Sequence, residues 1–209
     1  MIFLSGKWAR LFMRIGAKGD WQESYKELTQ KLSEPQRVYT NKDYVRSCFE
    51  QAELANPQQV TLDSLNALEL FIFLHKSICD PSRNDNIKKS SDFAYDFLGK
   101  MKVDEKLAEK TCKLITGDYQ KMDVVDLFLA RDILSSPWGV PYQVFVSNQE
   151  KFRQEHAFLT RPEFNQWISE VYQKMLGEDL IYLTPQFKNK YESITRKNLQ
   201  KFVRELKKE

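Results

Sequence analysis

The chain has 209 residues, 42% of them apolar and 13% aromatic, so a sizeable buried core is expected. Its formal net charge of +3, with 29% charged residues, is too even to indicate nucleic-acid binding, and no apolar run approaches the ~20 residues of a membrane span. Cys48, Cys79 and Cys112 are an odd number without paired spacing, which indicates reduced thiols in a cytosolic protein rather than a disulfide framework.

Three helices are expected in the first quarter of the chain. Apolar residues recur at helical spacing over residues 5–15, which predicts an amphipathic helix docked on the core. Attachment of that helix to a membrane surface is the alternative interpretation. Asp20 is the expected N-cap of a second helix, which residues 33–35 end, and a third helix is expected over residues 41–55.

The next predicted helix is the most apolar of the chain. Thr61 or Asp63 is its expected cap, and it is apolar on most faces as far as Leu74. A helix of this kind belongs at the centre of a bundle. Further helices are expected over residues 85–100, 104–116 and 122–135.

The clearest break in the helical pattern is the segment 136–141, Ser-Pro-Trp-Gly-Val-Pro. Two helices are expected after it, over residues 142–157 and 161–176. Thr184-Pro185 then fits an N-cap with proline at the first helical position, and it opens a last helix that ends near residue 206.

No segment reads as a strand with a convincing partner, and the chain has neither an internal repeat nor a low-complexity region. The pattern therefore predicts an all-α fold, built as a helical bundle. We expect residues 1–209 to form a single domain, in which the C-terminal helices of residues 138–209 pack on the same core.

Three polar groups along the chain are candidates for chemistry. The first is the segment 33–41, where Thr40 or Asn41 equally suits an ordinary helix cap. The second is the end of the most apolar helix, together with the turn that follows it, and the third lies in the helix predicted over residues 122–135. The candidate pocket residues of these groups are Arg37, Thr40, Tyr44, His75, Lys76, Asp80, Arg83, Asp85 and Asp132.

Each group also has a structural interpretation. His75 can be a core histidine bonded to a carbonyl group or a carboxylate, and Lys76 follows a buried run, so it needs a partner or a route to water. Asp132 either points inward and pairs with Lys76 or is a surface charge. His75 and His156 are the only histidines of the chain, so a histidine-rich metal centre cannot be built. The group around Glu155 and His156 is a further, weaker candidate.

Taken in order, these groups resemble the small bacterial branch of the HD superfamily, predicted metal-dependent phosphohydrolases. Four family patterns carry the resemblance: Glu-Pro-His-Arg-x-Tyr-His-Asn, Phe-His-Asp, Asp-Pro-x-x-Asn-Asp-Asn-Glu and Phe-Leu-Asp-Ala-Asp-Leu. They are matched in part by residues 34–41, 74–76, 80–87 and 128–133, with further matches at residues 8–11, 153–156, 181–185 and 195–199. The resemblance covers nearly the whole chain and implies the helical bundle of the HD domain.

The departures from the family patterns fall on the residues that hold metal in the family. The early histidines of the family correspond to Gln36, Thr40 and Tyr44, and the aspartate of the His-Asp doublet corresponds to Lys76. The later aspartate pair corresponds to Ala130 and Asp132, and the acidic residue after Asn86 corresponds to Ile87. Lys76 also brings a positive charge to about where the family binds its ion, so we expect no metal site.

The resemblance and its departures imply the family's fold without its hydrolysis. We expect a ligand-binding or protein-interaction module without a cofactor, and its cleft suits an anion such as a small phosphorylated ligand. A structural ion pair between Lys76 and Asp132 is the alternative use of the same residues. A second functional class is a working phosphohydrolase with a divalent metal ion on His75, Asp80, Asp85 and Asp132. A nucleic-acid-associated protein is a third class, and we expect neither a nucleic-acid partner nor a membrane.

Overall fold

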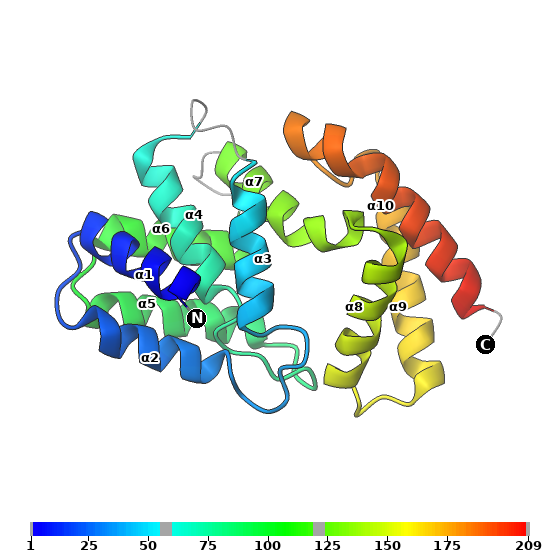
Figure 1. Ribbon diagram of the computed structural model, residues 1–209, viewed down its shortest axis with the longest axis horizontal. Helices are drawn as coiled ribbons and strands as arrows, with labels where there is room; N and C mark the ends of the chain where they lie inside the picture. Colours follow the sequence, from blue (N-terminus) through cyan, green and yellow to red (C-terminus); the bar gives the residue numbers. More distant parts are fainter. Residues whose placement is uncertain (1, 55–59, 119–123, 208–209) are drawn as a thin grey trace.

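The computed structural model describes residues 2–54, 60–118 and 124–207, and every regular element within these ranges is a helix, which confirms the predicted all-α class (Figure 1). None of these helices is both long and apolar enough to cross a membrane. The helices are α1 (Ile2–Arg14), α2 (Trp21–Lys31), α3 (Lys42–Ala52), α4 (Leu62–Leu74), α5 (Asn86–Lys100), α6 (Glu105–Thr116), α7 (Val124–Ser135), the 3-10 helix η1 (Ser136–Gly139), α8 (Tyr142–Glu155), α9 (Arg161–Leu176) and α10 (Pro185–Leu206).

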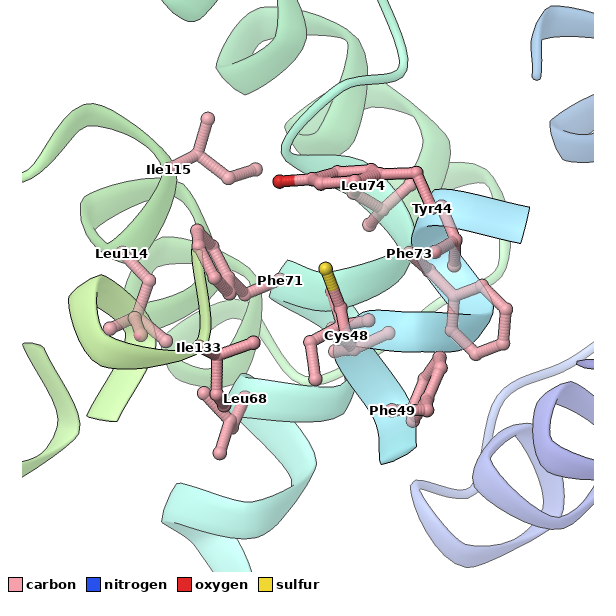
Figure 2. Close-up of a cluster of buried hydrophobic side chains, with 14 of the residues drawn as sticks. Tyr44, Cys48, Phe49, Leu68, Phe71, Phe73, Leu74, Leu114, Ile115 and Ile133 are labelled. Carbon is pink, nitrogen blue, oxygen red and sulfur yellow. The ribbon is translucent and has the colours of Figure 1, made fainter. Parts of the chain in front are cut away.

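Helix α4 lies at the centre of the first seven helices, as its apolar sequence predicts. It contacts α3, α5, α6 and α7, and buried residues occur on nearly all of its faces. Figure 2 shows Phe71, Phe73 and Leu74 of α4 among side chains from α3, α6 and α7. The helix ends at Leu74, so His75 and Lys76 emerge directly from the most buried part of the core.

Several helices begin at N-cap residues that the sequence predicts, among them α10 at Thr184, with proline at its first position. Asp20 accepts a hydrogen bond from the backbone of the first turn of α2. Where the sequence leaves two choices, the structure selects Asn41 rather than Thr40 for α3, and Thr61 rather than Asp63 for α4. Thr40 is used differently, because its hydroxyl bonds to a residue of α8.

Several helix ends differ from the prediction by a few residues. Helix α1 begins at Ile2 rather than near residue 5, because Leu4 is already buried against the core. Helix α3 ends at Ala52 and α8 at Glu155, both earlier than predicted. The loop expected at residues 56–57 and the helix start expected at residue 122 lie outside the described residues.

Helices α8, α9 and α10 form a second group beside the first, and η1 joins the two groups (Figure 1). Asn198 of α10 holds η1 in place by donating to the carbonyl groups of Trp138 and Val140, both at 2.8 Å. Gly139 packs directly on Tyr191, since a Cβ atom there would lie 2.5 Å from the Tyr191 ring. These contacts set Trp138 at the junction between the two groups of helices.

Candidate functional site

His75 is a buried histidine with both ring nitrogens engaged. Nδ1 donates to the carbonyl groups of Phe71 at 3.0 Å and Ile72 at 3.1 Å, so Nε2 accepts from the hydroxyl of Tyr44 at 3.3 Å. Burial, with a contribution from the neighbouring charge of Lys76, lowers the pKa of His75 to about 3. His75 is therefore a neutral part of the core at pH 7, as its structural interpretation predicts.

The low pKa of His75 predicts how stability depends on pH. The unfolded chain binds a proton near the ordinary histidine pKa of 6.5, whereas the folded chain does not bind it until about pH 3, so stability falls as the pH drops through this window. Between pH 7 and pH 5, the stability advantage of the wild type over His75→Gln should shrink by about 2 kcal/mol. Urea unfolding at several pH values measures this difference. Parallel curves for the two proteins would contradict the assignment.

Lys76 is the functional candidate that the structure leaves without a counter-charge. Lys76 lines two cavities, and its ammonium group makes no ion pair or hydrogen bond with any described residue. The alternative in which Lys76 pairs with Asp132 is wrong, because the Asp132 carboxylate is occupied elsewhere. The charge of Lys76 is thus available to a ligand.

Asp132 serves instead as a bracket between α7 and the start of α10. Its Oδ1 accepts from the backbone N–H of Leu183 at 2.9 Å, and its Oδ2 accepts from the N–H and hydroxyl of Thr184 at 2.8 and 2.6 Å. The side chain is fully buried, and this burial raises the pKa of the carboxyl group. Asp132 lines neither of the two cavities.

Arg37 is also a structural residue, and its guanidinium group is completely enclosed. It donates to the carbonyl groups of Lys76 at 2.6 Å, Ser77 at 3.0 Å and Thr40 at 3.2 Å, and its Nε pairs with Glu34. The arginine fixes the backbone of Lys76 and Ser77 to the loop before α3. It positions Lys76 and is not itself an anion site.

Thr40 is held by Glu155 from the end of α8. Oε1 of Glu155 accepts from the backbone N–H groups of Tyr39 and Thr40, at 2.8 and 2.7 Å, and from the Thr40 hydroxyl at 2.9 Å. Because that hydroxyl proton is used, the thiol of Cys79 donates to Thr40 Oγ1 at 3.2 Å. Glu155, a weaker candidate in the sequence, thus joins the second group of helices to the first.

The turn after His75 and Lys76 carries its charges on the surface, away from His75. Asp80 accepts from the backbone and hydroxyl of Ser82, and Asp85 pairs with Arg83 through two hydrogen bonds and with Lys89. The arginine–aspartate pair lowers the pKa of Asp85, and the bonds from Ser82 lower the pKa of Asp80. These residues bond within the turn and to the start of α5, and they line neither cavity that contains Lys76.

Two cavities meet at Lys76, Leu134 and Trp138, which line both. The first, which we call the aliphatic cavity, has a volume of about 470 Å³ and lies among the ends of α4, α6 and α7 and the segment before α10. The second, the aromatic cavity, has a volume of about 270 Å³. Its aromatic lining residues are Tyr39, Tyr44, Trp138, Phe152, Trp167 and Tyr172.

Of the nine residues predicted for the site, the structure brings His75 and Lys76 to the aliphatic cavity, and Thr40, Tyr44 and Lys76 to the aromatic cavity. Sequence reasoning missed Trp138 and Trp167. These tryptophans come from segments about 60 to 90 residues beyond Lys76, and no local motif marks them.

The donors proposed for a divalent metal do not fit such an ion. Both nitrogens of His75 are engaged, Asp132 binds backbone N–H groups, and Asp80 and Asp85 sit on the surface turn. No group of three histidine, cysteine, aspartate or glutamate side chains within the described ranges is placed to share a metal ion.

A scan of protein-family models and searches of curated proteins and of solved structures found no match to this chain.

Proposed function

We propose that the chain is a degenerate relative of the HD phosphohydrolases that binds a small anionic ligand and has no metal-dependent hydrolysis. One observation carries this proposal. At six positions the sequence replaces a histidine or acidic residue of the family patterns, and five of the six line the two cavities around Lys76. The five are Thr40, Tyr44, Lys76, Ile87 and Ala130, and the sixth is Gln36.

Most polar residues that match the family patterns have the opposite distribution, with His75 and Tyr39 as exceptions that line a cavity. Five of these residues hold segments together through hydrogen bonds, and none of the five lines either cavity. They are Arg37, Asp132, Glu155, Thr184 and Asn198. Most polar residues that match the family hold the fold together, whereas most residues that differ from it line the cavities. This distribution supports a protein that keeps the family's fold and has a different function at its site.

The chemistry of Lys76 supports an anion as the ligand. Lys76 lines both cavities, and its ammonium group has no counter-charge among the described residues, so it gains a favourable Coulombic partner when an anion binds. The lining side chains come from several helices, as is usual for small-molecule sites. We favour a small ligand over a protein partner, because Lys76 lines two cavities of small-molecule size.

Removal of the Lys76 charge tests the proposal. Titration calorimetry with phenyl phosphate should show binding to the wild type and at least a tenfold weaker affinity for Lys76→Met, because the one unpaired cation among the described lining residues is lost. Lys106→Met is the matched control, since Lys106 is an exposed lysine of α6 that lines neither cavity. Equal affinity of the wild type and Lys76→Met would overturn the proposal.

The family relationship has a separate test. Restoring the family residues through Thr40→His, Tyr44→His, Lys76→Asp and Ala130→Asp in one variant should create affinity for Mn²⁺ or Ni²⁺, since the corresponding positions then supply metal ligands. Circular dichroism checks that the variant is folded, and equilibrium dialysis measures the metal. A folded variant without metal affinity would contradict the relationship.

The working phosphohydrolase is the alternative, and no specific contact in the site favours it. The wild type should therefore show no turnover of bis(4-nitrophenyl) phosphate with Mn²⁺, Ni²⁺ or Zn²⁺ added. Turnover that disappears in His75→Gln and persists in a His156→Gln control would support the enzyme instead.

A further inference from the structure

The aliphatic cavity has a lining that restricts the ligand it can take. Its walls are formed largely by apolar side chains, among them Phe71, Leu114, Leu127, Ile181 and Leu183. Its volume of about 470 Å³ falls within the range of small-molecule sites. Sugar hydroxyls or further phosphates buried against these walls would lack hydrogen-bond partners, which disfavours a nucleotide here.

Among the described residues that line the aliphatic cavity, one positive charge has no partner. Arg131 also lines it, but its guanidinium group is paired with the carboxylate of Glu178, which lines the cavity too. His75, the other basic lining residue, is neutral at pH 7 because burial lowers its pKa. Lys76 remains as the one unpaired positive charge among the described lining residues. One such charge matches a ligand with one negative head group.

One exposed residue of the cavity lining is also apolar. Ile87 is the second residue of α5, lines the aliphatic cavity and is 56% exposed, so an apolar side chain stands at its border with solvent. An exposed apolar residue is ordinary when it stands alone, but this one also lines a largely apolar cavity. A ligand with an apolar body would bury Ile87 together with the inner wall.

We infer that the ligand of the Lys76 site is an amphipathic acid, whose anionic head pairs with the ammonium group of Lys76 while its apolar body fills the aliphatic cavity. This inference rests on the proposed function and narrows its ligand class. A carboxylate and a phosphate monoester share the head-group chemistry required. The area of apolar surface buried then governs affinity, at about three- to fourfold per methylene group.

Calorimetry with a homologous series, below the micelle concentration of each ligand, tests the inference. Affinity should rise from hexanoate through octanoate to decanoate, and decanol and decyltrimethylammonium should bind at least tenfold more weakly than decanoate. Decyl phosphate, compared with decanoate, shows which head group is preferred. Lys76→Met should reduce decanoate binding at least tenfold and leave the weak binding of decanol unchanged.

A second variant tests the position of the apolar body without altering the buried core. Ile87→Glu places a negative charge at the rim and should weaken decanoate binding about tenfold or more. Ile194→Glu is the matched control, because Ile194 is an exposed residue of α10 that lines neither cavity. Equal effects of the two substitutions would overturn the placement.

The possible results separate this inference from the proposal on which it rests. Lys76-dependent binding of phenyl phosphate, with no binding of decanoate or no dependence on chain length, overturns the amphipathic ligand and leaves the anion site standing. Decanoate and decanol binding alike, with no effect of Lys76→Met, overturns the head-group contact. Absence of binding by every anion overturns both.

Discussion

Asp132→Ala is expected to lower the free energy of unfolding by about 3 to 5 kcal/mol. The substitution leaves the N–H groups of Leu183 and Thr184 and the hydroxyl of Thr184 without their acceptor, at a position where Asp132 is fully buried. Water cannot easily replace the carboxylate there, so the cost of the unsatisfied donors is nearly complete. Urea unfolding followed by circular dichroism measures the loss.

Two further variants at aspartates define the origin of that loss. Asp132→Asn retains one side-chain oxygen that can accept a hydrogen bond, so its loss should be smaller than that of the alanine variant. Asp85→Ala removes a partly exposed carboxylate of the surface turn and should cost only a small part of the stability that Asp132→Ala loses. If Asp132→Ala were as stable as Asp85→Ala, the bracket between α7 and α10 would not have the role assigned to it.

Arg37→Met is expected to cost about 3 to 4 kcal/mol of stability. It leaves the carbonyl groups of Lys76, Ser77 and Thr40 without their donor and the carboxylate of Glu34 without its partner. Arg37→Lys keeps the positive charge but lacks the planar guanidinium group that donates to several carbonyl groups at once. We therefore expect its stability to lie between those of the wild type and Arg37→Met. The same unfolding experiment ranks the three proteins.

Arg46→Met is the matched control for Arg37→Met. Arg46 makes an exposed ion pair with Glu50 one turn away on α3, and removal of such a pair costs about 0.5 kcal/mol or less. Because Arg37 fixes the backbone of Lys76, Arg37→Lys should also weaken phenyl phosphate binding, whereas Arg46→Met should not. A fully stable Arg37→Met would contradict the view that this arginine organises the end of α4.

The parts of the fold that were predictable from the sequence depend on neighbouring residues. Asp20, Asn41 and Thr61 cap helices through bonds to the backbone two or three residues later, so the sequence pattern contains both partners. The central position of α4 was predictable for the same reason, because its apolar residues cover nearly every face. Helix ends were less certain, since burial of residues such as Leu4 extends a helix past its apparent start.

The roles of the polar site residues were not predictable, because their partners lie far away in the chain. Asp132 bonds to residues 51 and 52 positions later, and Glu155 bonds to Thr40, 115 positions earlier. The sequence alone therefore left open whether Asp132 pairs with Lys76. The structure excludes this pair, because Thr184 at the start of α10 donates two hydrogen bonds to the Asp132 carboxylate.

The candidate site has an unpaired positive charge because Asp132 does not pair with Lys76. Asp132 bonds to the segment before α10, and Arg37 bonds to carbonyl groups. Lys76, which lines two cavities, therefore has no counter-charge among the described residues. A lysine at such a position carries the cost of partial desolvation without a compensating partner in the fold. An anionic ligand supplies the partner, and this view of Lys76 is the centre of the account.

Side-chain NMR of Lys76 tests this view most directly. In protein labelled with ¹³C and ¹⁵N at lysine, the Lys76 signals are identified as those missing from Lys76→Met. On titration with phenyl phosphate, these signals should shift and saturate at the dissociation constant found by calorimetry, while those of Lys106 stay in place. Lys76 signals that do not move when calorimetry shows the protein to be saturated would contradict the account.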